Sequence, residues 1–364
     1  MGTPNIKFSR NDSAKFFRTL NQRVNNYFKD NNLEKSGNWK LHFKSFCMFA
    51  IFLTPYFLLL TVDLPGWAQI LLTIVMGIGM AGVGMNVMHD ANHGSYSKKK
   101  WVNKVLGSSI YILAGNVYNW QVQHNVLHHT YTNIHGLDDD IDAGLIIRFN
   151  EHAEWRWFHK FQQYYFVFLY GLLTFNWALV SDYKQTKKYL SRKLGYGEMP
   201  KPARQWSILV ITKVIYLFVW IVITLLVLDI AWWKVILGFF IMHYTAGLIL
   251  SIIFQLAHVV ESSDMPLPDE SGNMKNTWAI HQLFTTVNFA RNNWLINWYS
   301  GGLNHQVEHH IFPHISHIHY QGISKIVKET ALEFELPYLE YKTTRKAILS
   351  HVRHLRKMGM QPAV

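Results

Sequence analysis

Four apolar stretches constrain this chain more than any other feature of its sequence, because each is long enough to cross a bilayer, which takes about 20 residues. They cover residues 45–62, 67–88, 208–228 and 235–257. Residues 63–66 connect the first pair and a few residues around Asp229 connect the second pair, so neither connection can hold a domain. We therefore expect two membrane-spanning hairpins, with all of the bulky polar sequence on one side of the membrane.

The basic residues lie almost entirely on that polar side. Nine lysines and arginines precede the first stretch, 14 lie between residues 89 and 207, and ten follow residue 258, whereas the two connections hold only Lys234. The positive-inside rule then predicts that both termini and the polar side are cytoplasmic. The formal net charge of +12 is explained by membrane orientation and attraction to membrane lipids, and we expect no nucleic acid among the partners. The first 40 residues have no apolar core, so they predict no cleavable signal peptide.

These patterns predict an all-α integral membrane protein in which four transmembrane helices, paired in two hairpins, carry a cytoplasmic helical cap. A further apolar stretch at 164–180 is dense in aromatic residues, which favours a helix in the membrane interface over a fifth span; residues 105–117 are expected to behave similarly. The chain is then divided into an N-terminal segment, a hairpin, a cytoplasmic region, a second hairpin and a C-terminal cytoplasmic region. These are residues 1–44, 45–88, 89–207, 208–257 and 258–364. A bacterial inner membrane and the endoplasmic reticulum both suit this plan.

Histidine is the compositional anomaly, with 20 histidines in 364 residues. Three clusters read H-D-A-N-H at residues 89–93, H-N-V-L-H-H at residues 124–129 and H-Q-V-E-H-H at residues 305–310. In an α-helix, positions i and i+4 share a face, so His124 and His128 lie together, with His129 turned about 100° further round. The two-hairpin topology delivers all three clusters to the same side of the membrane, where they can meet.

The clusters predict a metal centre bound through nitrogen. Cys47 is the only cysteine, which excludes a cysteine-ligated cluster, and imidazole suits zinc, copper, iron and nickel alike. Seven or eight imidazoles are more than one metal holds, and the three or four ligands usual for zinc do not explain the number. We therefore expect two metal ions, interpreted as a redox pair of irons. The alternative is a histidine-rich basic surface that titrates near neutrality.

One more histidine lies at the end of the fourth apolar stretch. Gln255, His258 and Glu261 recur every three residues and so share a helix face that can point into the polar region. His258 is therefore a further candidate ligand. The alternative is a histidine that snorkels at the membrane interface.

In these motifs the chain resembles the membrane-bound fatty acid desaturases, whose signature is three histidine boxes spaced around two transmembrane hairpins. The resemblance covers roughly residues 45–320, with H-D-A-N-H, H-N-V-L-H-H and Q-V-E-H-H in the family's order. Gln306, where other members have histidine, resembles the front-end subgroup, as do G-G-L-N before this box and I-F-P after it. Front-end enzymes, of the delta-5 and delta-6 type, add a double bond between an existing one and the carboxyl end.

The resemblance implies a non-haem di-iron site. Transferred residue by residue, the family's ligands fall on His89, His93, His124, His128, His129, His258, His309 and His310. Gln306 takes the remaining position, directly or through water, and His305, one place earlier, is the alternative. Carboxylates that can hydrogen-bond the ligand imidazoles are Asp90, Asp138, Asp139, Asp140, Glu261 and Glu308. For the run of three aspartates, solvated loop acids are an equally good account.

The implied activity is an oxygen-dependent desaturation of a long-chain, already unsaturated acyl-CoA or acyl-lipid, with O2 as co-substrate. Many front-end enzymes carry a fused cytochrome b5 domain with an H-P-G-G motif. The first 44 residues here contain His42 and no such motif. We therefore expect electrons from a separate donor, cytochrome b5 or a ferredoxin, served by an NAD(P)H reductase.

Two other functions are weighed against desaturation. A di-iron lipid hydroxylase or ketolase uses the same scaffold, although Gln306 in the third box favours desaturation. A histidine-rich membrane metal or haem carrier would place its polar residues near the middle of the spans, where only Lys213 and His243 lie.

Overall fold

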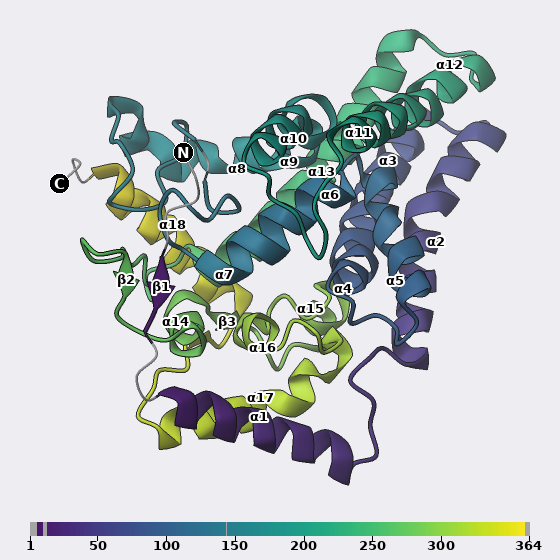
Figure 1. The fold of residues 1–364 in the computed structure, drawn as a ribbon. Helices are drawn as coiled ribbons and strands as arrows, with labels where there is room; N and C mark the ends of the chain where they lie inside the picture. The colour runs from purple at the N-terminus through teal and green to yellow at the C-terminus, as the bar shows by residue number, and fades with distance from the viewer. Residues whose placement is uncertain (1–5, 10–12, 143, 361–364) are drawn as a thin grey trace. The chain divides into compact units, whose positions relative to one another are not determined.

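The computed structural model describes residues 6–9, 13–142 and 144–360, which are predominantly helical (Figure 1). This confirms the predicted all-α membrane fold. The chain forms two units. The membrane unit comprises Asn38–Val122 and Val167–Ile252, and the polar unit comprises Met1–Gly37, Gln123–Phe166 and Ile253–Val364. Of the predicted segments, the N-terminal and C-terminal ones include residues 1–5, 10–12 and 361–364, which lie outside the described residues.

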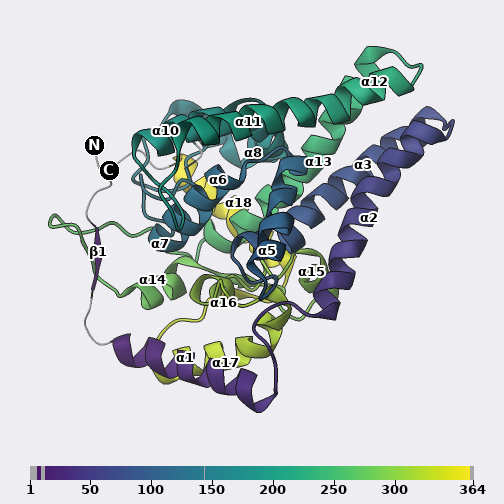
Figure 2. The same cartoon turned by 45° about the vertical axis from the view of Figure 1, so that its right-hand side comes forward.

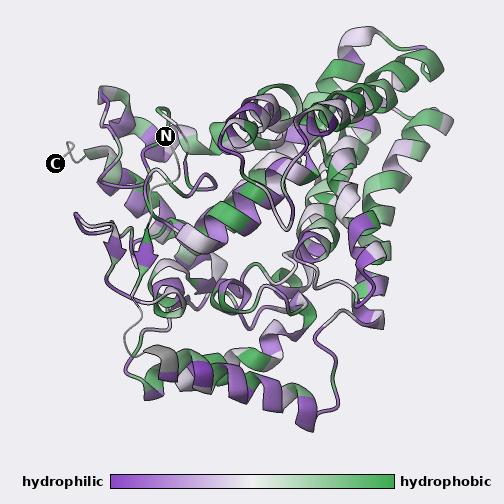
Figure 3. Cartoon of the chain, viewed as in Figure 1, coloured by the Kyte–Doolittle hydropathy of each residue, from purple (hydrophilic) through white to green (hydrophobic). Residues whose placement is uncertain are grey.

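Four helical spans are long and apolar enough to cross a membrane, and they match the four predicted stretches. They are α2 (Trp39–Thr61); α3 (Gly66–Val83) with η1 (Gly84–Met88) and α4 (His89–Asn92); α11 (Pro202–Leu217) with η6 (Phe218–Ile223) and α12 (Thr224–Val227); and α13 (Trp232–His258). Figure 3 shows hydrophobic residues predominating along α2, α11 and α12. Helices α2 and α3 run side by side, as Figures 1 and 2 both show.

Small residues let the spans of the membrane unit approach closely. A Cβ atom on Gly79 would overlap the backbone of Phe52 in α2, and one on Gly77 would come within 2.6 Å of the carbonyl oxygen of Met242 in α13. Spans surrounded by lipid gain little from the hydrophobic effect, so such close van der Waals packing is what holds them together. At its start, α2 is capped by Asn38, whose Oδ1 accepts a hydrogen bond of 3.0 Å from the backbone of Lys40.

The apolar stretch at 164–180 is broken rather than straight. It lies within two helical arms, Trp157–Gly171 and Leu173–Ser191, that meet at an angle of 58°. The arms consist of η4 (Trp157–Phe161) and α8 (Gln162–Gly171), then α9 (Leu173–Asn176), η5 (Trp177–Ser181) and α10 (Asp182–Ser191). η4 and the first half of α8 fall in the polar unit, whereas α9, η5 and α10 belong to the membrane unit. The other helices of the membrane unit are α5 (Lys100–Gly107), η2 (Ser108–Leu113) and α6 (Val117–Trp120).

Lys213 and His243, two polar residues inside the spans, form hydrogen bonds with the second arm. Lys213 of α11 donates from Nζ to Asp182 Oδ2 at 2.5 Å and to the Trp177 carbonyl oxygen at 2.7 Å. His243 of α13 lies 3.0 Å from the Thr174 hydroxyl of α9 through Nδ1 and 2.7 Å from the Tyr216 hydroxyl of α11 through Nε2. Because unpaired polar groups are costly among apolar spans, these contacts give both residues a structural role in attaching α9–α10.

The polar unit is built on a helical core that includes α1 and α17, which lie side by side in Figures 1 and 2. Its buried apolar side chains come from α1, α14, α16, α17 and the loop after α16. Two parallel strand pairs, β1 with β2 and β3 with β4, join segments that are distant in sequence: residues 7–8 pair with 273–274, and residues 288–289 pair with 340–341. Its elements are β1 (Lys7–Phe8), α1 (Ser13–Asp30), α7 (His129–Tyr131), β2 (Asn273–Met274), α14 (Trp278–Thr285), β3 (Asn288–Phe289), α15 (Trp294–Tyr299), α16 (Gln306–Ile311), η7 (His317–His319), α17 (Tyr320–Glu333), β4 (Glu340–Tyr341) and α18 (Thr344–Met360); η3 (Gln121–His128) begins at the unit boundary.

Replacing Lys213 with methionine should destabilise the protein by about 3–5 kcal/mol, because it leaves the buried carboxylate of Asp182 without its cation. We expect a clearly lower midpoint for thermal unfolding of the detergent-solubilised protein. Adding Asp182→Asn should recover much of the loss, since the double variant buries no unpaired charge. Lys187→Met, on the exposed side of α10, is the matched control. Equal midpoints for Lys213→Met and Lys187→Met would contradict the structural role.

Candidate metal centre

The second histidine cluster lies on η3 and at the start of α7. The η3 segment is π-helical, so its backbone bonds run from residue i to i+5 and place His129 one turn from His124. The rings of His124 and His128 stack 5.1 Å apart, and the ring of His129 lies 4.8 Å from that of His124. The sequence spacing predicted the first pair on an α-helix. The wider π-helical turn adds His129 to the same group.

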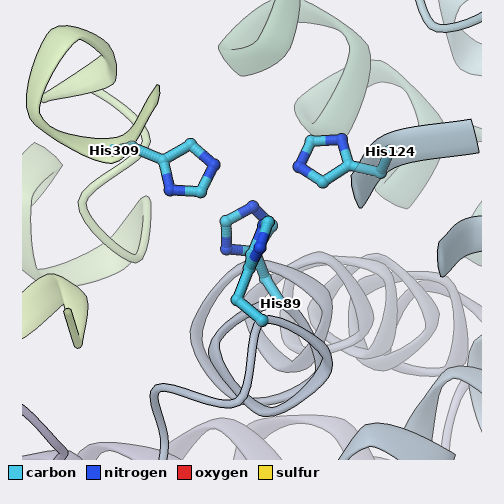
Figure 4. A group of neighbouring side chains, drawn as sticks. His89, His124 and His309 are labelled. Carbon is cyan, nitrogen blue, oxygen red and sulfur yellow. The ribbon is translucent and has the colours of Figure 1, made fainter. Parts of the chain in front are cut away.

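Two further segments bring histidines to this cluster within the polar unit. Helix α16 carries the third motif, and the last turn of α13 ends at His258. Two sets of three have one ring nitrogen each within 4.8 Å of the others: His128, His258 and His310, and His129, His309 and His310. Figure 4 shows the rings of His124 and His309 facing one another. Six histidines predicted from three separate parts of the sequence therefore converge here.

Two aspartates hold the Nδ1 atoms of the second cluster. His124 Nδ1 donates to Asp140 Oδ2 at 2.7 Å, and His128 Nδ1 donates to Asp138 Oδ2 at 2.9 Å. Asp138 is itself held by the backbone N–H of Asn133 at 2.8 Å. Histidines that ligate metals commonly donate their second ring N–H to a carboxylate, which fixes the tautomer and the ring orientation. This leaves Nε2 as the atom of each ring that could bind a metal.

Neutral side chains contact the Nδ1 atoms of the third cluster. His309 Nδ1 lies 3.1 Å from the Tyr320 hydroxyl, and His310 Nδ1 lies 2.8 Å from Gln282 Oε1, which also accepts from Thr132 at 2.8 Å. Sequence reasoning did not single out Tyr320 or Gln282. No motif marks them, because they reach the histidines only through the packing of α14 and α17 against α16.

The buried atoms at the centre suit a bound cation. Among the described residues, His128 Nε2 and Gln306 Oε1 have no hydrogen-bond partner, and both side chains are buried. A buried polar atom without a partner costs free energy, and a metal that accepts its lone pair removes that cost. The donor set is nitrogen with some oxygen and no thiolate, which suits iron and other imidazole-binding metals.

Burial and charge also perturb the supporting groups. Burial raises the pKa of Asp140 to about 7. Burial lowers the pKa of His128, but the neighbouring Asp138 carboxylate outweighs this, so the pKa of His128 lies above its ordinary value. A metal bound to His128 must therefore displace a proton that the Asp138 pair favours, and metal affinity should fall as the pH falls.

The helix that carries the third motif begins at Gln306, one residue after the motif's first histidine, His305. Helix α16 starts at Gln306, whose Nε2 lies 2.8 Å from His258 Nε2, so this side chain faces the histidine group. His305 precedes the helix, and its Nδ1 lies 3.8 Å from Glu308 Oε2. Burial, together with the charge of Arg291, lowers the pKa of His305 to about 3. His305 is thus a neutral buried side chain that faces Glu308.

The other carboxylates of the predicted set lie elsewhere. Glu308 is buried and accepts hydrogen bonds from Asn288 Nδ2 at 2.8 Å and from the Tyr338 hydroxyl at 2.7 Å, which ties α16 to β3 and to the segment before β4. Glu261 is exposed, 4.0 Å from Arg353. Asp90 is buried in α4 of the membrane unit.

The first motif lies in the membrane unit. The π-helical η1 precedes α4, which begins at His89 and ends just before His93. The rings of His89 and His93 are 4.7 Å apart, and Trp120 lies 5.7 Å from the first and 5.5 Å from the second. The predicted i, i+4 pair is therefore formed at the end of the second span.

The chain matches the family described as "Fatty acid desaturase" over residues 65–342. It is 35% identical, over 99% of its length, to the sn-1 linoleoyl-lipid 6-desaturase of Arthrospira platensis, of which it covers 96%. It is 36% identical, over 97% of its length, to the sn-1 linoleoyl-lipid 6-desaturase of Synechocystis sp., of which it covers 98%. It is 31% identical to the acyl-lipid (8-3)-desaturase of Physcomitrium patens, over 98% of this chain and 74% of that protein.

The chain therefore belongs to the fatty acid desaturase family, which confirms the resemblance drawn from its three histidine motifs. It is a membrane oxidoreductase that desaturates fatty acyl chains.

Substituting Asp138 by alanine should lower metal affinity by about 10- to 100-fold, because His128 then loses the partner that orients its ring. Metal content and competition with a chelator in purified protein measure this without turnover. Asp142→Ala, an exposed aspartate in the same loop, is the control and should bind metal as wild type. If both variants bind metal equally, Asp138 does not support the centre.

Leucine substitutions distinguish Gln306 from His305 while keeping similar volume. We expect Gln306→Leu to lose metal and most activity, because its amide faces His258, whereas His305→Leu should retain metal. Metal analysis of the folded, detergent-purified variants decides between them. The reverse ranking would show that His305 is the residue of the third motif that serves the metal.

Proposed function

We propose that this desaturase adds a double bond on the carboxyl side of an existing double bond, in a long acyl chain carried by a membrane lipid. The observation that carries the proposal is the convergence of six buried histidines on one space, four of them with Nδ1 held by a polar partner. The names of the relatives, lipid 6-desaturases and an acyl-lipid (8-3)-desaturase, support a lipid carrier and a position near the carboxyl end.

We further propose that the centre holds two irons. The residues that would hold them are His89, His93, His124, His128, His129, His258, His309, His310 and, directly or through water, Gln306. When bound, the irons would supply the reduction of O2 and the removal of hydrogen from an unactivated methylene. Overall, two C–H bonds break and one C=C bond forms, which supplies two electrons and two protons; an external donor supplies two more electrons and the solvent two more protons, so that O2 leaves as two waters.

The chain's own residues prepare this chemistry. Asp138 and Asp140 keep a proton on Nδ1 of their histidines, so that the Nε2 lone pairs stay directed at the metal. The amide of Gln306 is a weaker ligand than imidazole, and we propose that its position is the most readily exchanged. Burial of the cluster excludes bulk water from the oxidising species.

Electrons are proposed to come from a separate one-electron carrier, cytochrome b5 or a ferredoxin, reduced by an NAD(P)H reductase on the cytoplasmic side. Helix α18 supports this, because it contains no acidic residue and exposes five basic ones. They are Arg345, Lys346, Arg353, Arg356 and Lys357. Such a surface steers an acidic carrier toward the polar unit, and the attraction weakens with salt.

Expression in a host without front-end desaturases, fed linoleic acid, tests the activity. We expect fatty acid analysis by mass spectrometry to show a new double bond between the carboxyl group and the existing bonds. His128→Leu should give no product, whereas His152→Leu, an exposed histidine of the same unit, should give the wild-type product. A hydroxylated chain would instead support the hydroxylase alternative, and no product with a reductase and carrier present would contradict the proposal.

Active protein purified from the membrane should contain about two irons per chain, because eight candidate imidazoles exceed the capacity of one site. Elemental analysis measures the content directly. One metal per chain, or zinc in active preparations, would contradict the di-iron proposal.

A further inference from the structure

A pocket of about 450 Å³ lies beside the first histidine motif, within the membrane unit. Part of its wall is formed by Ala91 and Asn92, which lie between the motif's two histidines, and by Gly94, which follows them. Residues 196–201, in the segment before α11, form another part. Nothing in the desaturase chemistry above uses this pocket.

The pocket lies where two candidate membrane spans end. One span ends at Asn92 and another begins at Pro202, and both ends border the pocket. Helix α5 forms a side of it and is amphipathic: Trp101 and Val105, four residues apart, are 65% and 60% exposed. An exposed tryptophan and an aliphatic residue on one face of a short helix are typical of a helix that lies in the interface.

The charge of the pocket is strongly positive. On α5, Lys100 and Lys104 are also four residues apart, so one face of the helix turns two lysines to the pocket. Lys201 and Arg204 line it from the start of α11. Glu198 is the one acidic residue among the lining residues, which leaves a net charge of +3. All four cations are exposed, so an anion in solution or on a lipid can reach them.

Asn92, in the wall of the pocket, is fixed by hydrogen bonds within the membrane unit. Asn92 donates from Nδ2 to the carbonyl oxygens of Met88 and Gly107, at 3.1 Å each. Its Oδ1 accepts from Gln121 Nε2 at 3.2 Å, and Gln121 is the first residue of the helix that carries the second motif. A ligand held in this pocket is therefore held at a defined place relative to the first motif.

We propose that this pocket binds the phosphate-bearing headgroup of an anionic membrane lipid, and that this lipid carries the acyl chain to be desaturated. Four cations around a cavity where two candidate membrane spans end suit a phosphodiester, and a membrane would present it at that level. The assignment to the substrate rests on the proposed function. It offers a physical reason why the double bond is placed by its distance from the carboxyl end, since the headgroup, and not the methyl end, is the part that is fixed.

The test is a comparison of two short-chain lipids, dihexanoyl phosphatidylglycerol and dihexanoyl phosphatidylcholine, by calorimetric titration of the full chain in neutral detergent. We expect phosphatidylglycerol to bind at least tenfold more tightly. The double variant Lys104→Gln with Arg204→Gln lowers the pocket charge to +1. It should weaken the binding of phosphatidylglycerol about tenfold, the equivalent of about 1.4 kcal/mol. Lys184→Gln with Lys187→Gln, two exposed lysines of α10 outside the pocket, is the matched control.

Equal binding of both lipids, or unchanged binding by the Lys104 and Arg204 double variant, would overturn the pocket assignment. If coenzyme A displaces phosphatidylglycerol and binds more tightly, the pocket takes its phosphate from a soluble thioester. That result would overturn the assignment of the pocket to a lipid headgroup.

A second readout separates this inference from the proposed function. In mixed vesicles that present the same acyl chain on both headgroups, the wild type should desaturate the phosphatidylglycerol pool preferentially, and the double variant should lose that preference. A preference that survives in the double variant would overturn the substrate role. Headgroup binding without any desaturation would overturn the proposed function, and with it the substrate role, while the binding result would stand.

Discussion

Six imidazoles buried around one space require hydrogen-bond partners from the rest of the polar unit. Each ring has two nitrogens, and a buried nitrogen without a partner is costly, so one must be satisfied by the protein if the other is to face a metal. Asp138, Asp140, Tyr320 and Gln282 meet this requirement for four rings. The loop after η3, the helix α14 and the helix α17 are therefore as much part of the centre as the histidine motifs.

The apolar core of the polar unit makes these contacts dependable. Val307 and Ile311 of α16 are fully or almost fully buried with residues of α1, α14 and α17, so the helix that carries His309 and His310 cannot turn without disrupting that core. Glu308 adds a polar attachment through Asn288 and the Tyr338 hydroxyl. A ligand set held this way is preorganised, which is what metal sites need for defined geometry.

The membrane unit meets the same physical requirement among apolar spans. Lys213 and His243 are the two polar residues that sequence patterns place deep in spans, and each is paired with the second arm of the broken helix. They do not mark a transport pathway. They attach α9–α10 to α11 and α13, and the loop that continues from α10 then forms a wall of the basic pocket beside the first motif.

The sequence by itself determined the four spans, because a run of about 20 apolar residues has few other stable states. It also determined the three histidine motifs and, through their resemblance, the family. The tertiary structure decided what spacing along the chain does not encode. The π-helical winding of η3 gathered His129 with His124, and the start of α16 turned Gln306 toward His258. Tyr320 and Gln282 became partners of His309 and His310 through packing between distant helices, where contact depends on geometry in space and not on sequence distance.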